Sequence, residues 1–524
     1  MIPALRGRRL HGRPPTALAR SVRSTGALPR SRWPRSIEAI MRRSAKAAAM
    51  AVVLLVGCGA GTVDATEGPL GPDGPTGPEA PAKPGDPTEP APDWAPLWAR
   101  SFADPAFENG YGAAGAKIVA GPDSSAIVAG DFRGALRMDG DGAPVPSTGE
   151  SDVFVAQFDA EGQPLWSLQL GGTEDQIFSG LAVDPAGNVL VTGVFAGTMT
   201  VGGETLTALG LDVFLVKIDP DGGVLWTRRY GSDPVESIQW AHAVAADGDG
   251  NVLLAGNLEG TLDLGGTALT HGALFPFVVK LDPEGEPLWS ATFKGSVDQE
   301  IVDIGADAAG NVLVAGHAER TDIQGVKLDG AGQMDLLAVS LTPAGALRWA
   351  RLLGSEEDEL LTGMAVDPAG DLVVSGTFRG ELDIDDVHLT SPAGKYTGMV
   401  ARLSGADGEA AWARALPSGI ALEDMAIDSA GDLVAAGTLT LTATAAGPLG
   451  CDAQVMRLDG SDGATLWTGR FGDAAEQRVT SIATDALGRA LVAGVFGGAV
   501  EVGGAELSSE SGHDLFAAAL TPGN

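Results

Sequence analysis

The feature that most constrains this chain is a repeated pattern of short apolar runs separated by tight turns. In the clearest copy, residues 182–231, Asp184-Pro185-Ala186-Gly187 precedes the apolar run 188–193, and Asp219-Pro220-Asp221-Gly222 precedes the run 224–230. Aspartate suits the first position of a β-turn, proline pre-sets φ at the second, and glycine tolerates the end of the turn. Runs this short and this rich in Val, Ile and Leu are typical of strands, so each copy predicts four strands joined by turns.

The pattern occurs seven times. The aspartate of the first turn recurs at Asp123, Asp184, Asp247, Asp307, Asp367, Asp428 and Asp485, with steps of 63, 60, 60, 61 and 57 residues from Asp184 onward. The tryptophan of the fourth strand recurs at Trp98, Trp166, Trp226, Trp289, Trp349, Trp412 and Trp467. Four short strands repeated at a nearly fixed period predict a β-propeller with one blade per copy.

The two ends of the repeat array complement each other. The first tryptophan strand, residues 96–102, has no preceding strands of its own copy, and the last copy ends after its third strand, residues 514–520. The N-terminal strand can therefore complete the last blade, which would remove the open edges of a linear array. We predict an all-β fold, a seven-bladed β-propeller over residues 94–524 that is closed by its N-terminal strand.

The tryptophans stand at one fixed place in every copy. We expect them to be wedges between neighbouring blades, each burying a large area. The alternative is an exposed ring that stacks on glycans.

The first 93 residues lack the repeat and divide into three segments. Residues 1–40 are a basic extension, and we expect translation to start at Met41; a tail that binds nucleic acid is the alternative. Residues 41–57 place Arg42, Arg43 and Lys46 before a short apolar core, which is the pattern of an export signal rather than a transmembrane helix. Residues 58–93 are rich in Pro and Gly and predict a flexible, disordered linker.

Leu55-Val56-Gly57-Cys58, at the end of this signal, resembles the lipobox of bacterial lipoproteins. The resemblance implies a lipoprotein signal peptide that is cleaved before Cys58, and lipidation of the Cys58 sulfur. It also implies an exported protein attached to the membrane through this anchor, in the outer membrane or at the cell surface. An ordinary secretory signal, with Cys58 incidental, is the alternative.

The repeat itself resembles the bacterial SBBP β-propeller family. The residues that carry the resemblance are 184–193, with the sequence Asp-Pro-Ala-Gly-Asn-Val-Leu-Val-Thr-Gly, and 210–219. The resemblance implies a propeller on exported or surface proteins and no common enzymatic activity.

The charge of the chain limits its partners. The net charge is −34, and the first 57 residues hold 12 of the 34 Lys and Arg but one of the 68 Asp and Glu, so the repeat region is strongly acidic. Such a surface repels nucleic acid and suits cations or basic partners. We expect a monomer that binds an envelope protein or polysaccharide; solubility alone is the simpler explanation of the charge.

The loops between each fourth strand and the next first strand are often acidic. In a propeller these loops share one face, so we predict a ring that binds a cation, such as calcium, or a basic partner. The candidate residues are Glu174, Asp175, Asp298, Glu300, Glu357, Asp358, Glu359, Glu423, Asp424 and Glu476. Solvated turn residues are the alternative.

No catalytic constellation is recognisable in the sequence. The six histidines stand at non-equivalent repeat positions without metal-ligand spacing, and Trp240 and His242 form the most asymmetric segment. Cys451 is expected to be a small buried residue without a partner, because Cys58 is assigned to the lipid. We predict a non-enzymatic, membrane-tethered binding or scaffold module without cofactor. The alternatives are a propeller lyase or glycoside hydrolase that uses acidic residues at the channel mouth, and an envelope spacer without a specific ligand.

Overall fold

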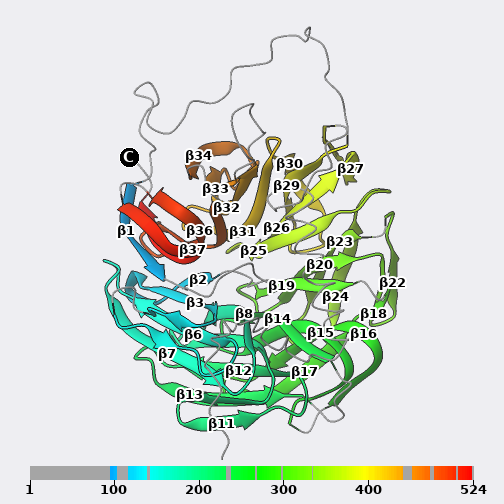
Figure 1. Cartoon of the computed structure of the whole chain (residues 1–524). Helices are drawn as coiled ribbons and strands as arrows, with labels where there is room; N and C mark the ends of the chain where they lie inside the picture. Colours follow the sequence, from blue (N-terminus) through cyan, green and yellow to red (C-terminus); the bar gives the residue numbers. More distant parts are fainter. Residues whose placement is uncertain are drawn as a thin grey trace, which may run out of the picture.

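The computed structural model shows a chain built from strands (Figure 1). It describes residues 95–102, 116–138, 142–231, 238–265, 268–296, 299–332, 334–392, 394–440, 451–472, 477–502 and 505–521. The predicted basic extension, signal peptide and linker lie outside these residues. Within them the one helical element is the short 3₁₀ turn η1 (Pro122–Ser124), and no helix is long and apolar enough to cross a membrane.

The main strands form seven antiparallel sheets, six of four strands and one of four strands extended by a hairpin. The first strands of the sheets are β2 (Lys117–Ala120), β8 (Gln176–Val183), β14 (Ile238–Ala246), β19 (Glu300–Ala306), β25 (Leu360–Val366), β31 (Ile420–Ile427) and β35 (Gln477–Thr484). The second strands are β3 (Ala126–Phe132), β9 (Val189–Phe195), β15 (Val252–Asp263), β20 (Val312–Ala318), β26 (Leu372–Arg379), β32 (Leu433–Thr440) and β36 (Ala490–Val502). The third strands are β6 (Asp152–Phe158), β12 (Asp212–Ile218), β16 (Ala268–Leu281), β23 (Asp335–Leu341), β29 (Tyr396–Leu403), β33 (Cys451–Leu458) and β37 (Ala505–Thr521). The fourth strands are β7 (Pro164–Gly172), β13 (Val224–Tyr230), β17 (Pro287–Thr292), β24 (Leu347–Leu353), β30 (Ala410–Ala415), β34 (Thr465–Phe471) and β1 (Ala95–Phe102).

Shorter strands lie between the second and third strands of several sheets or beside a fourth strand. They are β4 (Ala135–Leu136), β5 (Val145–Pro146), β10 (Thr198–Val201), β11 (Glu204–Thr207), β18 (Lys294–Gly295), β21 (Arg320–Ile323), β22 (Val326–Asp329), β27 (Glu381–Ile384) and β28 (Val387–Thr390).

The Asp-x-x-Gly segments form the predicted turns. In the copy at Asp184, the N–H of Gly187 donates to the carbonyl of Asp184 at 2.9 Å. The carboxylate Oδ1 of Asp184 accepts the backbone N–H groups of Ala186 and Asn188, both at 2.9 Å. The aspartate thus satisfies backbone donors inside the turn, and Gly187, at φ +84°, takes the left-handed conformation that a side chain would disfavour.

The second and third strands form the buried centre of each sheet. Every residue of β9 and of β12 is buried, whereas most residues of β13 are partly exposed and Leu225 is exposed. A strand that is apolar on both faces needs cover on both faces, and the core clusters join residues of neighbouring sheets. The continuous Val and Leu runs of the second strands therefore reflect packing between sheets.

The chain ends meet in one sheet. β1 pairs antiparallel with β37, with Ser101 opposite Phe516 and Trp98 opposite Ala519. The strand order of this sheet is β1-β37-β36-β35, and Figure 1 shows the blue β1 beside the red β37. The predicted pairing of the N-terminal strand with the last copy is present.

The first strands contact one another from sheet to sheet. β2 contacts β8, β8 contacts β14, and the series continues through β19, β25, β31 and β35, which returns to β2. These strands therefore lie at the inner side of the assembly of sheets, and the fourth strands are the outer edges.

Six of the seven first strands carry a β-bulge at the same place. The register against the second strand shifts at Ser179, His242, Val302, Thr362, Glu423 and Thr480. A bulge opposes two residues to one and redirects the side chains on either side of it. The sequence repeat gave no sign of these bulges.

Candidate functional site

Within the described residues, six of the seven fourth-strand tryptophans, all except Trp467, pack against the turn between the third and fourth strands of the next sheet. The indole Nε1 of Trp166 donates to the carbonyl of Pro220 at 2.9 Å, and that of Trp412 donates to the carbonyl of Gly460 at 3.1 Å. The same bond joins Trp226 to Pro283, Trp289 to Pro343 and Trp349 to Gly405. We call this arrangement the inter-sheet joint.

A glycine lies under the tryptophan ring in these joints. A Cβ added at Gly222 would come within 2.8 Å of the ring of Trp166, and one at Gly463 within 2.6 Å of the ring of Trp412. Both glycines also have positive φ. Glycine is needed at the joint for two reasons, conformation and close approach of the ring.

A cation completes several joints. Lys217 forms an ion pair with Asp184 of its own sheet at 2.9 Å and donates to the carbonyl of Pro283 in the next sheet at 3.1 Å. Burial opposes ionisation of Asp184, but hydrogen bonds from Asn188 and Lys217 outweigh it and hold the pKa of Asp184 below its usual value. Lys280 repeats these contacts with Asp247 and Pro343, and Arg402 with Asp367 and Gly460.

The joint between the last and first sheets also contains a cation, an arginine just before the second strand rather than a residue of the third strand. Arg489, which is buried, pairs with Asp485 and donates to the carbonyls of Ala160 at 2.8 Å and Ser124 at 2.7 Å. The ring of Trp98 lies over Gly162, where a Cβ would come within 2.4 Å of it. The closing joint therefore has the glycine under the ring and the buried cation of the other joints, but the indole Nε1 of Trp98 has no hydrogen-bond partner among the described residues.

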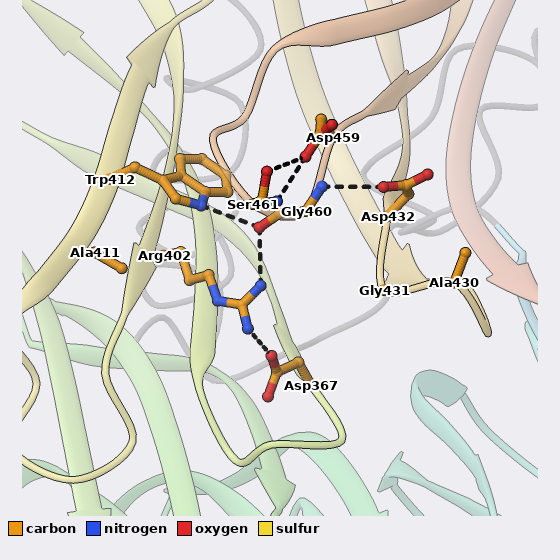
Figure 2. A pocket seen from close by; sticks show the side chains of 10 residues that line it. All are labelled: Asp367, Arg402, Ala411, Trp412, Ala430, Gly431, Asp432, Asp459, Gly460 and Ser461. Atoms are coloured by element: carbon orange, nitrogen blue, oxygen red, sulfur yellow. Dashed lines mark hydrogen bonds and ion pairs between the residues drawn. The ribbon is translucent and has the colours of Figure 1, made fainter.

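A cavity of about 460 Å³ lies at the joint between the sheets of β30 and β33 (Figure 2). It is lined by Asp367, Arg402, Ala411, Trp412, Ala430, Gly431, Asp432, Asp459, Gly460 and Ser461. Ala411 stands where most other copies have an exposed leucine, and the turn at Asp459 is one residue longer than the turn at Asp219. The cavity is thus an inter-sheet joint that is covered by a smaller side chain, Ala411 in place of leucine. Its Arg402 is already paired with Asp367 and with the carbonyl of Gly460, as Figure 2 shows.

The predicted acidic loop residues do not share one environment. Glu174 and Glu357 are exposed, Asp358 is half-buried, and Asp175 and Glu359 are buried. Glu357 pairs with Arg379, whereas Glu359 accepts the N–H and hydroxyl of Ser355 at 2.9 and 2.6 Å. Burial raises the pKa of Glu359 to about 7 despite those hydrogen bonds. Asp298 and Glu476 lie outside the described residues, and the expected calcium binding stays a prediction.

Three of the predicted loop residues lie in strands instead. Glu300 begins β19, and Glu423 and Asp424 lie within β31, with Glu423 at the bulge. Their placement in loops was therefore wrong. The first strands of these copies begin earlier in the sequence than the apolar pattern indicated, because polar residues occupy their inward positions.

Asp424 is the first residue after the bulge of its strand, where the register with the second strand resumes. The first strands of the other sheets have a residue at the equivalent position. The residues with polar side chains at this position are Lys117, Asp303, Asp424 and Ser481. Asp424 Oδ2 accepts the N–H of Ile482 at 3.0 Å and the hydroxyl of Ser481 at 2.8 Å, both from the next sheet. Burial raises the pKa of Asp303 to about 6, while the ammonium of Lys117 opposes that shift and also opposes the rise at Asp424.

Glu300 lies between two histidines that are far apart in the sequence. Its carboxylate oxygens are 3.4 Å from Nδ1 of His242 and 3.8 Å from Nε2 of His317. Burial raises the pKa of Glu300 to about 7 and lowers the pKa of both histidines to about 4, so near neutral pH the imidazoles are uncharged and Glu300 is only partly ionised. Asn257 lies against His242, and the ring of Trp240 is roughly parallel to that of His242 at 6.2 Å. We call His242, Asn257, Glu300 and His317 the central cluster.

The sequence singled out Trp240 and His242 but did not connect them with Glu300 and His317. His242 is at the bulge of β14, Glu300 starts β19, and His317 is in β20, so only the packing of two sheets brings them together. Within the described residues, no group of three or more His, Cys, Asp or Glu side chains is arranged to hold a metal ion.

Cys451 opens β33, is fully buried and is disulfide-bonded. The expectation that Cys451 has no partner was wrong. The sequence contains two cysteines, and a single sulfur cannot be in a disulfide and in a lipid thioether at once. Lipidation of Cys58, which lies outside the described residues, therefore requires that Cys58 is not held in a disulfide.

Comparison with curated proteins finds two partial matches. A WD repeat-containing protein of Acanthamoeba polyphaga mimivirus, described as uncharacterized, is 22% identical over 207 residues, which are 33% of this chain and 15% of that protein. The regulatory protein FlaEY of Caulobacter vibrioides is 26% identical over 318 residues, 55% of this chain and 32% of that protein. The chain therefore spans less than a third of the length of either relative.

Solved structures resemble the chain weakly. The quinohemoprotein alcohol dehydrogenase of Comamonas testosteroni has a TM-score of 0.37 at 12% identity, covering 81% of this chain and 76% of the enzyme. A protein of unknown function from Dyadobacter fermentans has a TM-score of 0.38 at 12% identity, covering 82% of this chain and all of that one. A likeness at this level does not extend to function.

The family comparison matches the repeat. The match covers one fourth strand, the next first strand and part of the following second strand, with Trp166 near its start and the turn at Asp184 near its end. By this match, residues 165–194 are a beta-propeller repeat of the SBBP family.

Proposed function

We propose that the chain is an exported, lipid-anchored envelope protein whose seven sheets are the blades of one β-propeller, closed by β1. The observation that carries the propeller part of this proposal is the uninterrupted series of first-strand contacts from sheet to sheet, supported by the tryptophan joints that link most neighbouring sheets. Such a ring is held at every interface, so it suits a rigid module that presents its loops to a partner.

The module acts by binding rather than by catalysis in this proposal. The acidic composition and the exposed carboxylates Glu174 and Glu357 favour a basic partner, an envelope protein or a cation-bridged polysaccharide, at the loop face. Glu359 and Asp175 are buried, so in this proposal they stabilise their own loops and do not contact the partner. The Pro- and Gly-rich residues 59–93 would connect this module to the lipid on Cys58.

The anchor is tested by metabolic labelling of the full-length protein with a palmitate analogue in a bacterial host. We expect label in the wild type and none in Cys58→Ala, with Cys451→Ala as the matched control that keeps its label. The thioether uses the sulfur of Cys58 alone, so the control separates lipid from disulfide. Equal labelling of Cys58→Ala and the wild type would refute the anchor, as would a wild type that takes up label only after Cys451 is removed.

One observation favours an enzyme as the second candidate. Burial raises the pKa of Glu300 to about 7, and two imidazoles lie beside it. A carboxyl group with a pKa near neutrality can both donate and accept a proton, as a general acid–base catalyst must. A lyase or glycoside hydrolase would use it in that role. Turnover of a glycoside panel by the wild type, lost in Glu300→Gln with folding intact, would establish this candidate. A third candidate, a spacer without a ligand, would show neither turnover nor binding.

A further inference from the structure

Every described carboxylate of the inner strands except one has a cation nearby. Lys117 lowers the pKa of Asp303 and Asp424 against the effect of burial, and Arg478 forms an ion pair with Glu423 at 2.8 Å. Glu300 has none: its ion-pair contacts are the two histidines, and burial alone shifts its pKa. A buried carboxylate without a cation is costly, which makes Glu300 the exception that needs explaining.

Several polar atoms around Glu300 have no hydrogen-bond partner within the described residues. His317 is 3% exposed, and neither of its ring nitrogens has a hydrogen-bond partner. Asn257 is 5% exposed, and its Oδ1 also lacks one. Because burial keeps His317 uncharged, one of its nitrogens is an acceptor, so the cluster offers acceptor atoms from a carboxylate, an imidazole and an amide.

The cluster is not sealed from solvent. The side chains of Glu300 and His242 are 19% and 13% exposed. The carboxylate of Glu300 is therefore accessible from solvent, and the buried side chain of His317 lies next to it.

We propose that the central cluster is a binding site for a primary ammonium group, such as an alkylamine or the end of a polyamine. An ammonium carries three N–H donors and one positive charge, which match the carboxylate of Glu300, the lone pair of His317 and Oδ1 of Asn257. The nearby ring of Trp240 adds a surface that attracts a cation. This site is distinct from the exposed loop carboxylates of the proposed function, and it requires neither the lipid anchor nor a partner protein.

The charged groups around the site act in both directions, because the carboxylate of Glu300 attracts an ammonium group and the nearby ammonium of Lys117 repels one. His242 faces Glu300 from β14 and His317 from β20. Asn257 of β15 donates to the backbone carbonyl of Gln299 at 2.9 Å, and β25 contributes no titratable side chain. Lys117 of β2 is close enough to lower the pKa of His242 further, so it keeps that imidazole uncharged. Protonated Glu300 must release its proton when the ammonium binds, since the charged carboxylate is the form that the ligand stabilises.

The test is titration calorimetry of the full-length chain with n-butylamine near neutral pH, in two buffers of different ionisation enthalpy. We expect binding with proton release, so the measured heat should differ between buffers. n-Butanol, which lacks the charge, and tetramethylammonium, which lacks N–H donors, should each give no binding. Glu300→Gln should weaken butylamine binding by about tenfold or more, because it removes the charged partner.

Asp303→Asn is the matched control, because it removes a carboxylate of the same strand whose charge is already balanced by the nearby ammonium of Lys117. We expect it to bind butylamine within about twofold of the wild type. Thermal melts of both variants verify that they are folded. Equal loss in Asp303→Asn and Glu300→Gln would mean diffuse attraction to an acidic protein and would overturn the site. No heat with butylamine at millimolar concentration would overturn it as well, and equal binding of tetramethylammonium would overturn the hydrogen-bonding scheme.

Discussion

At the scale of single residues, the buried carboxyl groups of this protein differ in the direction in which their pKa is shifted. Asp184 is held ionised by Lys217 and by hydrogen bonds within its own turn. Glu300 has no such support and stays protonated up to about neutral pH. Both residue types are abundant in an acidic sequence, and the difference between them is set by the neighbours that packing supplies.

Glu300 makes stability fall as the pH rises from about 4.5 to about 7. Its pKa is higher in the folded chain than the usual 4.5, so the folded state binds more protons between that value and about 7. His242 and His317 act in the opposite direction between about 4 and 6.5, where the unfolded chain binds more protons. Above that range only the effect of Glu300 remains.

We therefore expect Glu300→Gln to be more stable than the wild type at about pH 8, by up to about 3 kcal/mol, and to lose that advantage below about pH 5. Urea unfolding at the two pH values measures the difference. Glu174→Gln, at an exposed position, should change little at either pH. A gain for Glu300→Gln that is the same at both pH values would show that its carboxyl does not titrate as described.

At the scale of elements, the inter-sheet joint is the repeated unit of stability. A fourth strand contributes the tryptophan, the next turn contributes a glycine and a carbonyl, and a lysine or arginine often joins them. Burial of the ring is not uniform: Trp98, Trp349 and Trp412 are buried, whereas Trp166, Trp226, Trp289 and Trp467 are half-buried. Rings that lie on glycine and donate to a carbonyl are wedges, which fits the expectation from the sequence better than glycan stacking does.

Replacement of the wedge should cost most where the ring is buried. We expect Trp412→Ala to lower the free energy of unfolding by about 3–5 kcal/mol, since it removes a buried aromatic and a hydrogen bond. Trp289→Ala, at a half-buried ring in an equivalent joint, should cost clearly less. Denaturant unfolding of both variants measures the difference. If Trp412→Ala unfolds like the wild type, the ring does not act as a wedge.

At the scale of the whole molecule, the two ends of the chain depend on one sheet. β1 is the fourth strand of the sheet formed by β35, β36 and β37, and it brings Trp98 to the joint with the first sheet. Without β1, the edge of β37 would be exposed and the joint at Gly162 would lose its ring. Loss of β1 would therefore weaken the last sheet and its contact with the first sheet directly.

Deletion of residues 95–102 should lower the thermal midpoint of unfolding and promote association through the exposed edge of β37. Calorimetry and sedimentation of the deletion variant measure these two effects. Deletion of residues 59–93, which precede β1, is the matched control and should leave the midpoint unchanged. Equal midpoints for both deletions would show that β1 does not hold the closing sheet.

The sequence by itself determined the repeated elements of this protein. The Asp-x-x-Gly turns, the apolar second strands and the fixed tryptophans are local patterns, and backbone sterics and side-chain periodicity turn each of them into a strand or a turn without long-range information. The unmatched first and last copies even indicated that β1 pairs with β37.

Only the tertiary structure decided what lies between the copies. The bulges shift the register of the first strands, and Glu300, Glu423 and Asp424 lie in strands rather than loops. His242, Glu300 and His317 are up to 75 positions apart in the sequence and meet because two sheets pack at a joint. Such contacts depend on how separate elements are rotated and spaced against each other, and no periodicity along the chain encodes that arrangement.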